Sequence, residues 1–223
     1  MTESWAVIAP VLPELGRALG QTLLMLALSL SAALLFGLPL GVLLRLTDRR
    51  QPLARPWLFW VLNVLVNTGR SFPFVILMIA LVPFTRLMTG TTIGPVAAAV
   101  PLSVAAVFFF ARLVEQSLRE VPHDVIEAAQ SLGATLPQIV CRVLLPEARI
   151  GLVLGFTVLA VSLLSYSAIA GVVGGGGVGD LAIRYGYYRF QTEIMLVTVT
   201  VLILLVQLIQ FMGNRIARRL DPR

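Results

Sequence analysis

Long apolar stretches, separated by short segments rich in arginine, restrict what this sequence can fold into. A membrane-spanning helix needs about 20 mostly apolar residues. The stretches that meet this length cover about residues 18–44, 56–88, 92–114, 150–173 and 193–212. We therefore predict an all-α, multi-pass membrane protein with five transmembrane helices. Its transmembrane domain covers residues 18–214, between an N-terminal segment at 1–17 and a tail at 215–223.

The composition agrees with a membrane protein and argues against a nucleic-acid partner. Only 13% of the residues are charged, whereas soluble globular proteins have about 25%. The net charge of +6 is carried by arginine, since the sequence contains no lysine. A basic balance can indicate nucleic-acid binding. Here the arginines lie between apolar stretches, which instead reports orientation in a lipid bilayer.

The arginines divide unequally between the two sides of the predicted bundle. Segments 45–55, 112–149 and 215–223 each hold four of the 17 arginines, and the opposite side holds four in total. Because cytoplasmic loops are enriched in arginine, we expect these three segments to lie in the cytoplasm. The N-terminus would then lie outside and the C-terminus inside.

The segment between the third and fourth stretches carries signals for two short helices. Pro122 suits the first turn of a helix, and Gly133 tolerates the left-handed conformation that often ends one. Thr135 can cap a second helix that runs to Pro146. Ala128–Ala129 would give the first helix a small, flat face. We expect such a helix to fit closely into a groove on a partner.

This segment also resembles the EAA loop of ABC importer permeases. The matching pattern is Glu127-Ala128-Ala129, three residues, Gly133, nine residues, then Val143-Leu144-Leu145-Pro146. The family often has isoleucine at the position of Val143. The resemblance implies the type I permease fold, with a cytoplasmic coupling loop at 115–149 that docks on a separate ATPase subunit. The docking role it implies falls on Glu127, Ala128, Ala129, Gly133 and Pro146. The alternative is an ordinary cytosolic loop.

Other segments are similar to the permeases of D/L-methionine ABC importers, among them Asn67 to Pro83, Tyr166-Ser167-Ala168 and Gly174 to Tyr188. This resemblance implies a homodimer in a bacterial inner membrane, two ATP-binding subunits on its cytoplasmic side and an external methionine-binding protein. ATP and magnesium would be bound by the partner subunits, so this chain would have no cofactor and no enzymatic activity. The alternatives are another amino acid or small organic solute as cargo, or a non-transporting membrane scaffold or regulatory subunit.

Several kinds of site are excluded by the residues present. One histidine and one cysteine are too few for a metal centre. The single histidine lies in the predicted cytoplasmic loop, where we expect no Ser/His/Asp triad. Gly174–Gly179 lacks the Gly-Lys-Ser/Thr of a phosphate-binding loop, so we interpret it as a flexible external loop. No Asp or Glu that could relay protons lies inside a predicted span, since Glu193 stands at the edge of the last one. Energy for transport must therefore come from another protein.

A polar group interrupts the second apolar stretch and consists of Asn67, Arg70, Ser71 and Pro73. An arginine at mid-membrane costs about 2.5–3.5 kcal/mol on insertion scales. We therefore predict one broken span whose polar break faces the protein interior. Two short segments with Arg70 at a surface are the alternative.

A second polar group lies in the fourth stretch and consists of Ser162, Ser165, Tyr166 and Ser167. We predict that this helix lines a translocation path. Ile169, at i+3 from Tyr166, can share its face and form an apolar constriction. Hydrogen bonds between helices are the alternative explanation.

Two further patterns concern packing. Gly37 and Gly41 permit a close approach between helices, with a lipid-facing surface as the alternative. Arg112, Glu115 and Arg119 have the spacing of helix neighbours at the end of the third stretch. We interpret them, with Glu120, as a solvated extension of that helix.

Overall fold

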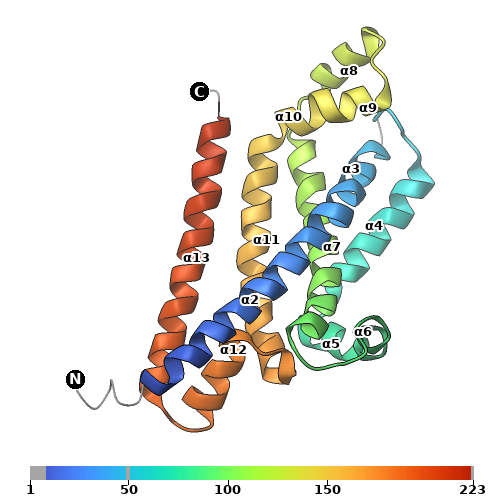
Figure 1. The fold of residues 1–223 in the computed structure, drawn as a ribbon. Helices are drawn as coiled ribbons and strands as arrows, with labels where there is room; N and C mark the ends of the chain where they lie inside the picture. The colour runs from blue at the N-terminus through green and yellow to red at the C-terminus, as the bar shows by residue number, and fades with distance from the viewer. Residues whose placement is uncertain (1–8, 49–50, 222–223) are drawn as a thin grey trace. The chain divides into compact units, whose positions relative to one another are not determined.

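The computed structural model describes residues 9–48 and 51–221 of this chain. The described residues form helices and no β-strand (Figure 1). In chain order, with η marking 3-10 and π-helical segments, the elements are η1 (Ala9–Val11), α2 (Leu12–Ala32), η2 (Ala33–Gly37), α3 (Leu38–Leu46), α4 (Pro56–Ser71), α5 (Phe74–Ala80), α6 (Val82–Thr89), α7 (Pro95–Arg119), α8 (His123–Ser131), α9 (Leu136–Ile139), η3 (Val140–Leu144), α10 (Leu145–Glu147), α11 (Arg149–Ala170), η4 (Gly171–Gly175), α12 (Gly177–Leu181), η5 (Ala182–Tyr187) and α13 (Thr192–Leu220).

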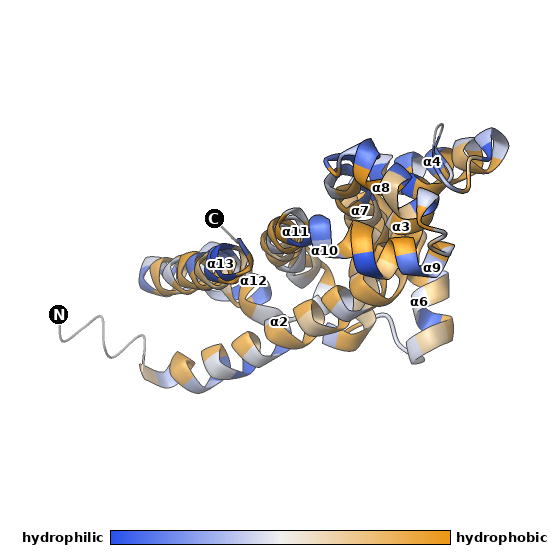
Figure 2. Ribbon diagram, turned by 90° about the horizontal axis from the view of Figure 1, so that it is seen from above, coloured by the Kyte–Doolittle hydropathy of each residue, from blue (hydrophilic) through white to orange (hydrophobic). Residues whose placement is uncertain are grey.

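Within the described residues, four helices are long and apolar enough to cross a membrane: Ala9–Leu46, Pro95–Arg119, Arg149–Gly175 and Thr192–Leu220. A fifth candidate span is the pair α4 and α5, which is bent by 101° at the break between them. Figure 2 shows apolar residues dominating α11 and α13, and more hydrophilic residues on α8. The all-α, multi-pass architecture predicted from the apolar stretches is confirmed.

The helices extend beyond the apolar stretches that predicted them. The helix α2 begins at Leu12 and carries Glu14 in its first turn, where a negative charge is favourable. The helix α7 continues to Arg119. Hydropathy predicts only the part of a helix that lies in the bilayer, and the helix can continue beyond that part into water. Of the predicted terminal segments, residues 1–8 and 222–223 lie outside the part of the chain that the structure describes.

The second apolar stretch breaks later than the sequence analysis predicted. Asn67, Arg70 and Ser71 belong to the last turns of α4, and only Phe72 and Pro73 are non-helical. The Ser71 hydroxyl donates to the carbonyl of Asn67 at 2.7 Å within that last turn. Pro73 has no N–H and disfavours helical geometry at the residue before it. The predicted polar break is therefore a proline break that follows a polar helical turn.

The chain divides into two compact units. The first comprises the described parts of residues 1–31, 72–105 and 160–209, and the second those of 32–71, 106–159 and 210–223. A core cluster in the first unit joins α2, α12 and α13 through Leu15, Ala18, Val178, Leu181 and Ile194. A cluster in the second joins α3, α4 and α7 through Leu44, Leu62, Val66 and Ala111.

Glycines on the first long helix allow α7 to approach closely in the second unit. A Cβ added to Gly37 would lie 2.8 Å from the carbonyl oxygen of Val107, and one added to Gly41 would lie 2.5 Å from that of Ala111. Neither contact could be relieved by moving a flexible side chain, because both atoms belong to the backbone. The close helix approach predicted for Gly37 and Gly41 is confirmed.

The glycine-rich segment in the first unit is a folded connection, which contradicts its interpretation as a flexible loop. The side chain of Gln21 accepts the N–H of Gly177 at 2.8 Å, and the hydroxyl of Thr22 accepts the N–H of Val178 at 3.0 Å. A Cβ added to Gly171 would lie 2.5 Å from the backbone nitrogen of Asp180. The glycines therefore permit tight packing of η4 on α12. Sequence alone cannot distinguish this use of glycine from flexibility.

Candidate functional site

The helix α8 has the start and stop that its sequence predicted. Pro122 is its N-cap residue and Asp124 lies in its first turn. Gly133 follows the helix with a φ of 77°, and its N–H donates to the carbonyl of Gln130 at 2.9 Å. This left-handed residue satisfies a carbonyl that would otherwise be left at the helix end. The predicted short helix and its glycine stop are therefore confirmed.

One side of α8 is apolar and exposed. Ile126 is fully buried, whereas Val125 and Ala128 are exposed and Leu132, the C-cap residue, has 89% of its surface exposed. Val125, Ala128 and Leu132 follow helical spacing, and we call them the apolar stripe of α8. Ala129 is half-buried beside it. An exposed apolar stripe on an otherwise polar helix is a surface that a partner can cover.

Glu127 lies outside the apolar stripe and is exposed to solvent. Its carboxylate is 3.0 Å from Nε2 of His123, one turn earlier. The backbone carbonyl of Glu127 accepts the hydroxyl of Ser131 at 3.0 Å. The carboxylate therefore remains accessible to a partner while its backbone stays within the helix.

Thr135 begins the next helical run with the cap that the sequence predicted. It forms a capping box with Gln138, whose side chain accepts the Thr135 N–H at 2.8 Å. The run continues to Pro146 in α10, but Val140–Leu144 is π-helical. The predicted second helix is therefore confirmed as a continuous helical run, whereas its π-helical turn was not predicted. Pro146 has no N–H to donate, so the hydrogen-bond ladder shifts register in the preceding turn.

The polar residues of α11 divide between two faces. Ser165 and Ile169 are exposed, and their i,i+4 spacing places them on the same face. Ser167 is buried, and its hydroxyl donates to the carbonyl of Leu164 at 2.7 Å. Ser162 is half-buried. The exposed neighbour of Ile169 is thus Ser165.

Tyr166 packs inward, so it does not share the exposed surface of Ile169. Its ring stacks on Phe74 of α5, with centroids 4.9 Å apart and an angle of 10° between the ring planes. This contact ties the end of α11 to the helix that follows the proline break. The i,i+3 spacing predicted that Tyr166 shares a face with Ile169, but no local pattern identifies Phe74 as the stacking partner of Tyr166.

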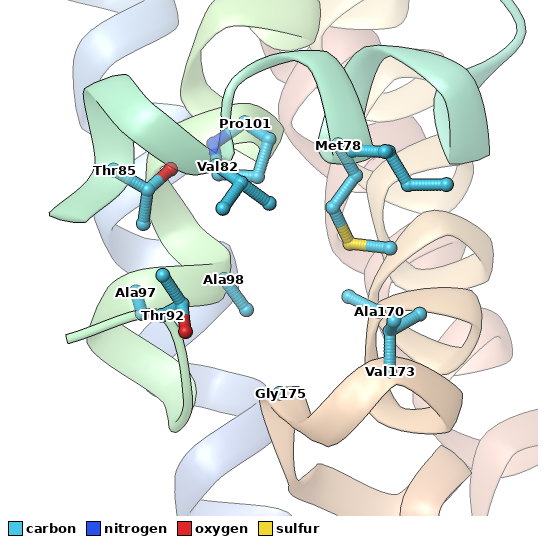
Figure 3. Close-up of a pocket in the computed structure, with 11 residues that line it drawn as sticks. Met78, Val82, Thr85, Thr92, Ala97, Ala98, Pro101, Ala170, Val173 and Gly175 are labelled. Atoms are coloured by element: carbon cyan, nitrogen blue, oxygen red, sulfur yellow. The ribbon is translucent and has the colours of Figure 1, made fainter.

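A small apolar cavity of about 60 Å³ lies in the first unit, beside the end of α11. Figure 3 shows Met78 and Val82 entering it from α5 and α6, Ala98 from α7, and Ala170 and Val173 from α11 and η4. Its other lining residues are Ile79, Thr85, Thr92, Ala97, Pro101 and Gly175. The cavity suits a small apolar group and offers no charged side chain among its lining residues. No pattern in the sequence predicted this cavity.

At the end of α7, Glu115 is buried and Arg112 is half-buried, which contradicts their interpretation as part of a solvated extension. Glu115 has no exposed surface, and its carboxylate accepts the Nη1 of Arg112 at 3.0 Å. Arg112 also reaches Asn63 on α4. Only Arg119 and Glu120 remain exposed. The predicted helical spacing of Arg112, Glu115 and Arg119 is correct, but a solvent-exposed ion pair and a buried ion pair have the same spacing along a helix.

A polar cluster in the first unit holds η5 against α2. The hydroxyl of Tyr185 donates to Glu14 at 2.6 Å, and Arg184 bridges Glu14 at 2.7 Å and Asp180 at 2.8 Å. The hydrogen bond to Glu14 raises the pKa of Tyr185, because the carboxylate stabilises the protonated phenol. The guanidinium of Arg189 lies 4.5 Å from the centre of the Tyr185 ring. These contacts fix the start of the loop that leads to α13.

Arg70 is exposed on the single chain, and its guanidinium carbon lies 5.7 Å from the centre of the Phe109 ring. The structure therefore does not bury it within this chain. Within the described residues, no group of three or more His, Cys, Asp or Glu side chains could hold a metal ion.

Comparisons with known proteins agree on one family. Residues 37–223 match the family model described as "Binding-protein-dependent transport system inner membrane component". The chain is 50% identical, over 91% of its length and 90% of the relative's, to "Probable D-methionine transport system permease protein MetI" of Vibrio cholerae. It is 45% identical to "D-methionine transport system permease protein MetI" of Escherichia coli K12, over 73% of this chain and 75% of that one.

A solved structure agrees with these sequence relatives. A chain from the structure described as inward-facing conformations of the MetNI methionine ABC transporter superposes with a TM-score of 0.93. The two chains are 44% identical, and the match covers 95% of this chain and 98% of the other.

Proposed function

Because this chain belongs to the family of binding-protein-dependent transport system inner membrane components, we propose that it is the permease subunit of an ATP-driven importer for D/L-methionine. The observation that carries the proposal is the apolar stripe of α8, exposed within the segment that has the EAA pattern. Relatives that cover most of the chain are named as methionine permeases, which supports methionine as the cargo.

The partners follow from the surfaces that the single chain leaves uncovered. A separate ATP-binding subunit, which holds ATP and magnesium, covers the apolar stripe of α8, with Glu127 accessible beside it. Two copies of this chain pair around the transport path, and the exposed Ser165 and Ile169 of each copy face that path. Two-fold pairing matches two ATP-binding subunits. Lipid covers the remaining apolar faces, and an external methionine-binding protein delivers the cargo.

The orientation follows from the distribution of arginine. The three segments that each hold four arginines, 45–55, 112–149 and 215–223, lie in the cytoplasm of a bacterial inner membrane. The N-terminus is then outside and the C-terminus inside. This orientation places α8 on the side of the membrane where ATP is available.

Reconstitution tests the proposal. The chain is co-expressed with its candidate ATP-binding subunit, purified and placed in liposomes with ATP inside. The binding protein and radiolabelled L- or D-methionine are added outside. We expect co-purification of both subunits and accumulation of methionine, which is abolished when a non-hydrolysable analogue replaces ATP.

Controls separate the alternatives. Leucine and histidine are supplied in parallel with their own binding proteins, and preferred uptake of one of them would contradict methionine as the cargo. An ATP-binding subunit that co-purifies without any uptake would indicate a scaffold or regulatory subunit. If no ATP-binding subunit co-purifies, the importer assignment itself is wrong.

A further inference from the structure

A buried carboxylate lies at the end of α7 between two arginines of the same helix. Glu115 has no exposed surface. Its Oε2 accepts Nη1 of Arg112 at 3.0 Å, and its Oε1 forms an ion pair with Arg119. A buried carboxylate needs such partners, because leaving an ion unpaired away from water is strongly unfavourable. Both arginines are therefore held in a defined place by the carboxylate of Glu115.

The same arginine joins α7 to α4. The Nη2 of Arg112 donates to Oδ1 of Asn63 at 2.7 Å and to Oδ1 of Asn67 at 2.5 Å. These two residues are one turn apart on α4 and belong to the same compact unit as the end of α7. Hydrogen bonds from a charged donor are stronger than neutral ones and fix geometry more closely.

The other arginine joins α7 to the turn after α3. Arg119 lies 3.6 Å from the carboxylate of Asp48, and Arg45 lies 3.7 Å from the same carboxylate. The network therefore links three segments of the second unit: the end of α3 with its turn, α4, and the last turns of α7. Its parts depend on one another, because each arginine is shared between two segments.

The network lies directly before α8. Only Glu120, Val121 and Pro122 separate Arg119 from the first residue of α8, and Val121 is itself buried. A displacement of α8 therefore reaches the end of α7 through a short connection. If that end were free, it could bend, and the displacement would not reach the other helices.

We propose that Glu115 is a positioning residue that makes the end of α7, α4 and the turn after α3 move together when α8 is displaced. The proposal rests on the proposed function, in which α8 binds the ATP-binding subunit. Glu115 touches neither the cargo nor ATP. Its role is to pass the movement of α8 to the membrane helices, so its loss separates ATP hydrolysis from transport.

The test compares Glu115→Gln with Glu120→Gln in the reconstituted complex. Both changes remove one negative charge, Glu115→Gln within the last turns of α7 and Glu120→Gln directly after it, but Glu120 is exposed. The readout is the number of methionine molecules accumulated per ATP hydrolysed, with thermal stability of the complex measured in parallel. We expect Glu115→Gln to lower this ratio roughly tenfold while ATP hydrolysis continues, the effect of losing charge-assisted contacts. Glu120→Gln should leave the ratio unchanged.

Two further variants keep the test decisive if Glu115→Gln is poorly folded. Asn67→Leu removes one acceptor of Arg112 without leaving a buried charge, and should lower the ratio about threefold. Arg112→Met with Glu115→Leu replaces the ion pair by apolar side chains, a change that buried pairs often tolerate. This double variant should be stable and still transport little methionine per ATP.

The possible results separate this inference from the proposed function. If the wild-type chain does not co-purify with an ATP-binding subunit, the proposed function fails before any variant is measured. If wild type transports and Glu115→Gln keeps its ratio, only the positioning role is wrong. A double variant with the wild-type ratio would likewise overturn it, because packing alone would then be sufficient.

Discussion

Replacing Leu132 with alanine measures how much the apolar stripe of α8 contributes to partner binding. Leu132 is 89% exposed in the single chain, so nearly all of its side chain is available for burial by a partner. The substitution removes three carbon atoms, each worth about 0.8 kcal/mol when buried. The loss is then about 2 kcal/mol per copy, or roughly thirtyfold in affinity for the ATP-binding subunit. The free chain should keep its stability, because the side chain contacts little there.

Leu87 provides a matched control for this measurement. It is 84% exposed and lies on α6, outside the coupling segment, so Leu87→Ala makes the same chemical change at another exposed position. Affinity is measured by titrating labelled ATP-binding subunit onto the permease in detergent or nanodiscs. We expect Leu132→Ala to weaken binding and Leu87→Ala to leave it unchanged. Equal affinities for both variants and wild type would refute the role of the apolar stripe.

Three other results follow from the structure. Arg70→Leu removes an insertion cost of about 2.5–3.5 kcal/mol, so the yield of membrane-inserted protein should be preserved. Transport should fall, and unchanged transport would show that the assembled permease does not use Arg70. With Cys141 replaced by serine, Ile169→Cys should cross-link two copies of the chain in the resting state, and the cross-linked fraction should fall when an ATP analogue is bound. If position 169 reacts only with lipid-phase reagents, Ile169 faces lipid and its place on the transport path is wrong. The hydrogen bond from Tyr185 to Glu14 should be fully present below the unfolded tyrosine pKa of about 10 and should be lost as the pH rises through the raised pKa of the folded state. Ultraviolet titration, with Tyr185→Phe as the reference, measures the pH at which Tyr185 loses its proton. Glu14→Gln should lower that pH, and an unchanged pH would exclude the contact with Glu14.

The fold was predictable where one physical requirement determines the structure. The length and hydropathy of the apolar stretches predict membrane-spanning helices, because a span must satisfy its backbone hydrogen bonds internally. The stop at Gly133 and the cap at Thr135 were also predictable, since both are local effects of backbone geometry. Gly171–Gly179 was not, because glycine serves both flexibility and close packing. Only its contacts with α2 and α12 show which applies.

The candidate site shows the same division between local and distant information. The start of α8 and its small residues can be read from a few neighbouring positions. By contrast, nothing near Tyr166 in the sequence identifies Phe74 as its stacking partner. The cavity beside α11 was also out of reach, since its walls come from five separate elements and a loop residue. Distant contacts of this kind require the fold to be known first.

The burial of Glu115 was harder to predict, although part of its signal is in the sequence. Arg112, Glu115 and Arg119 have the spacing of a surface ion pair, so their own helix gives no sign of burial. The missing clue lies on α4, where Asn63 and Asn67 occur one turn apart within an apolar stretch. Two amides on one face of such a helix need hydrogen-bond partners away from water, and an arginine can donate to both at once. A pair of this kind in one apolar stretch, with an arginine near the end of another, therefore predicts a contact between their helices before either is placed.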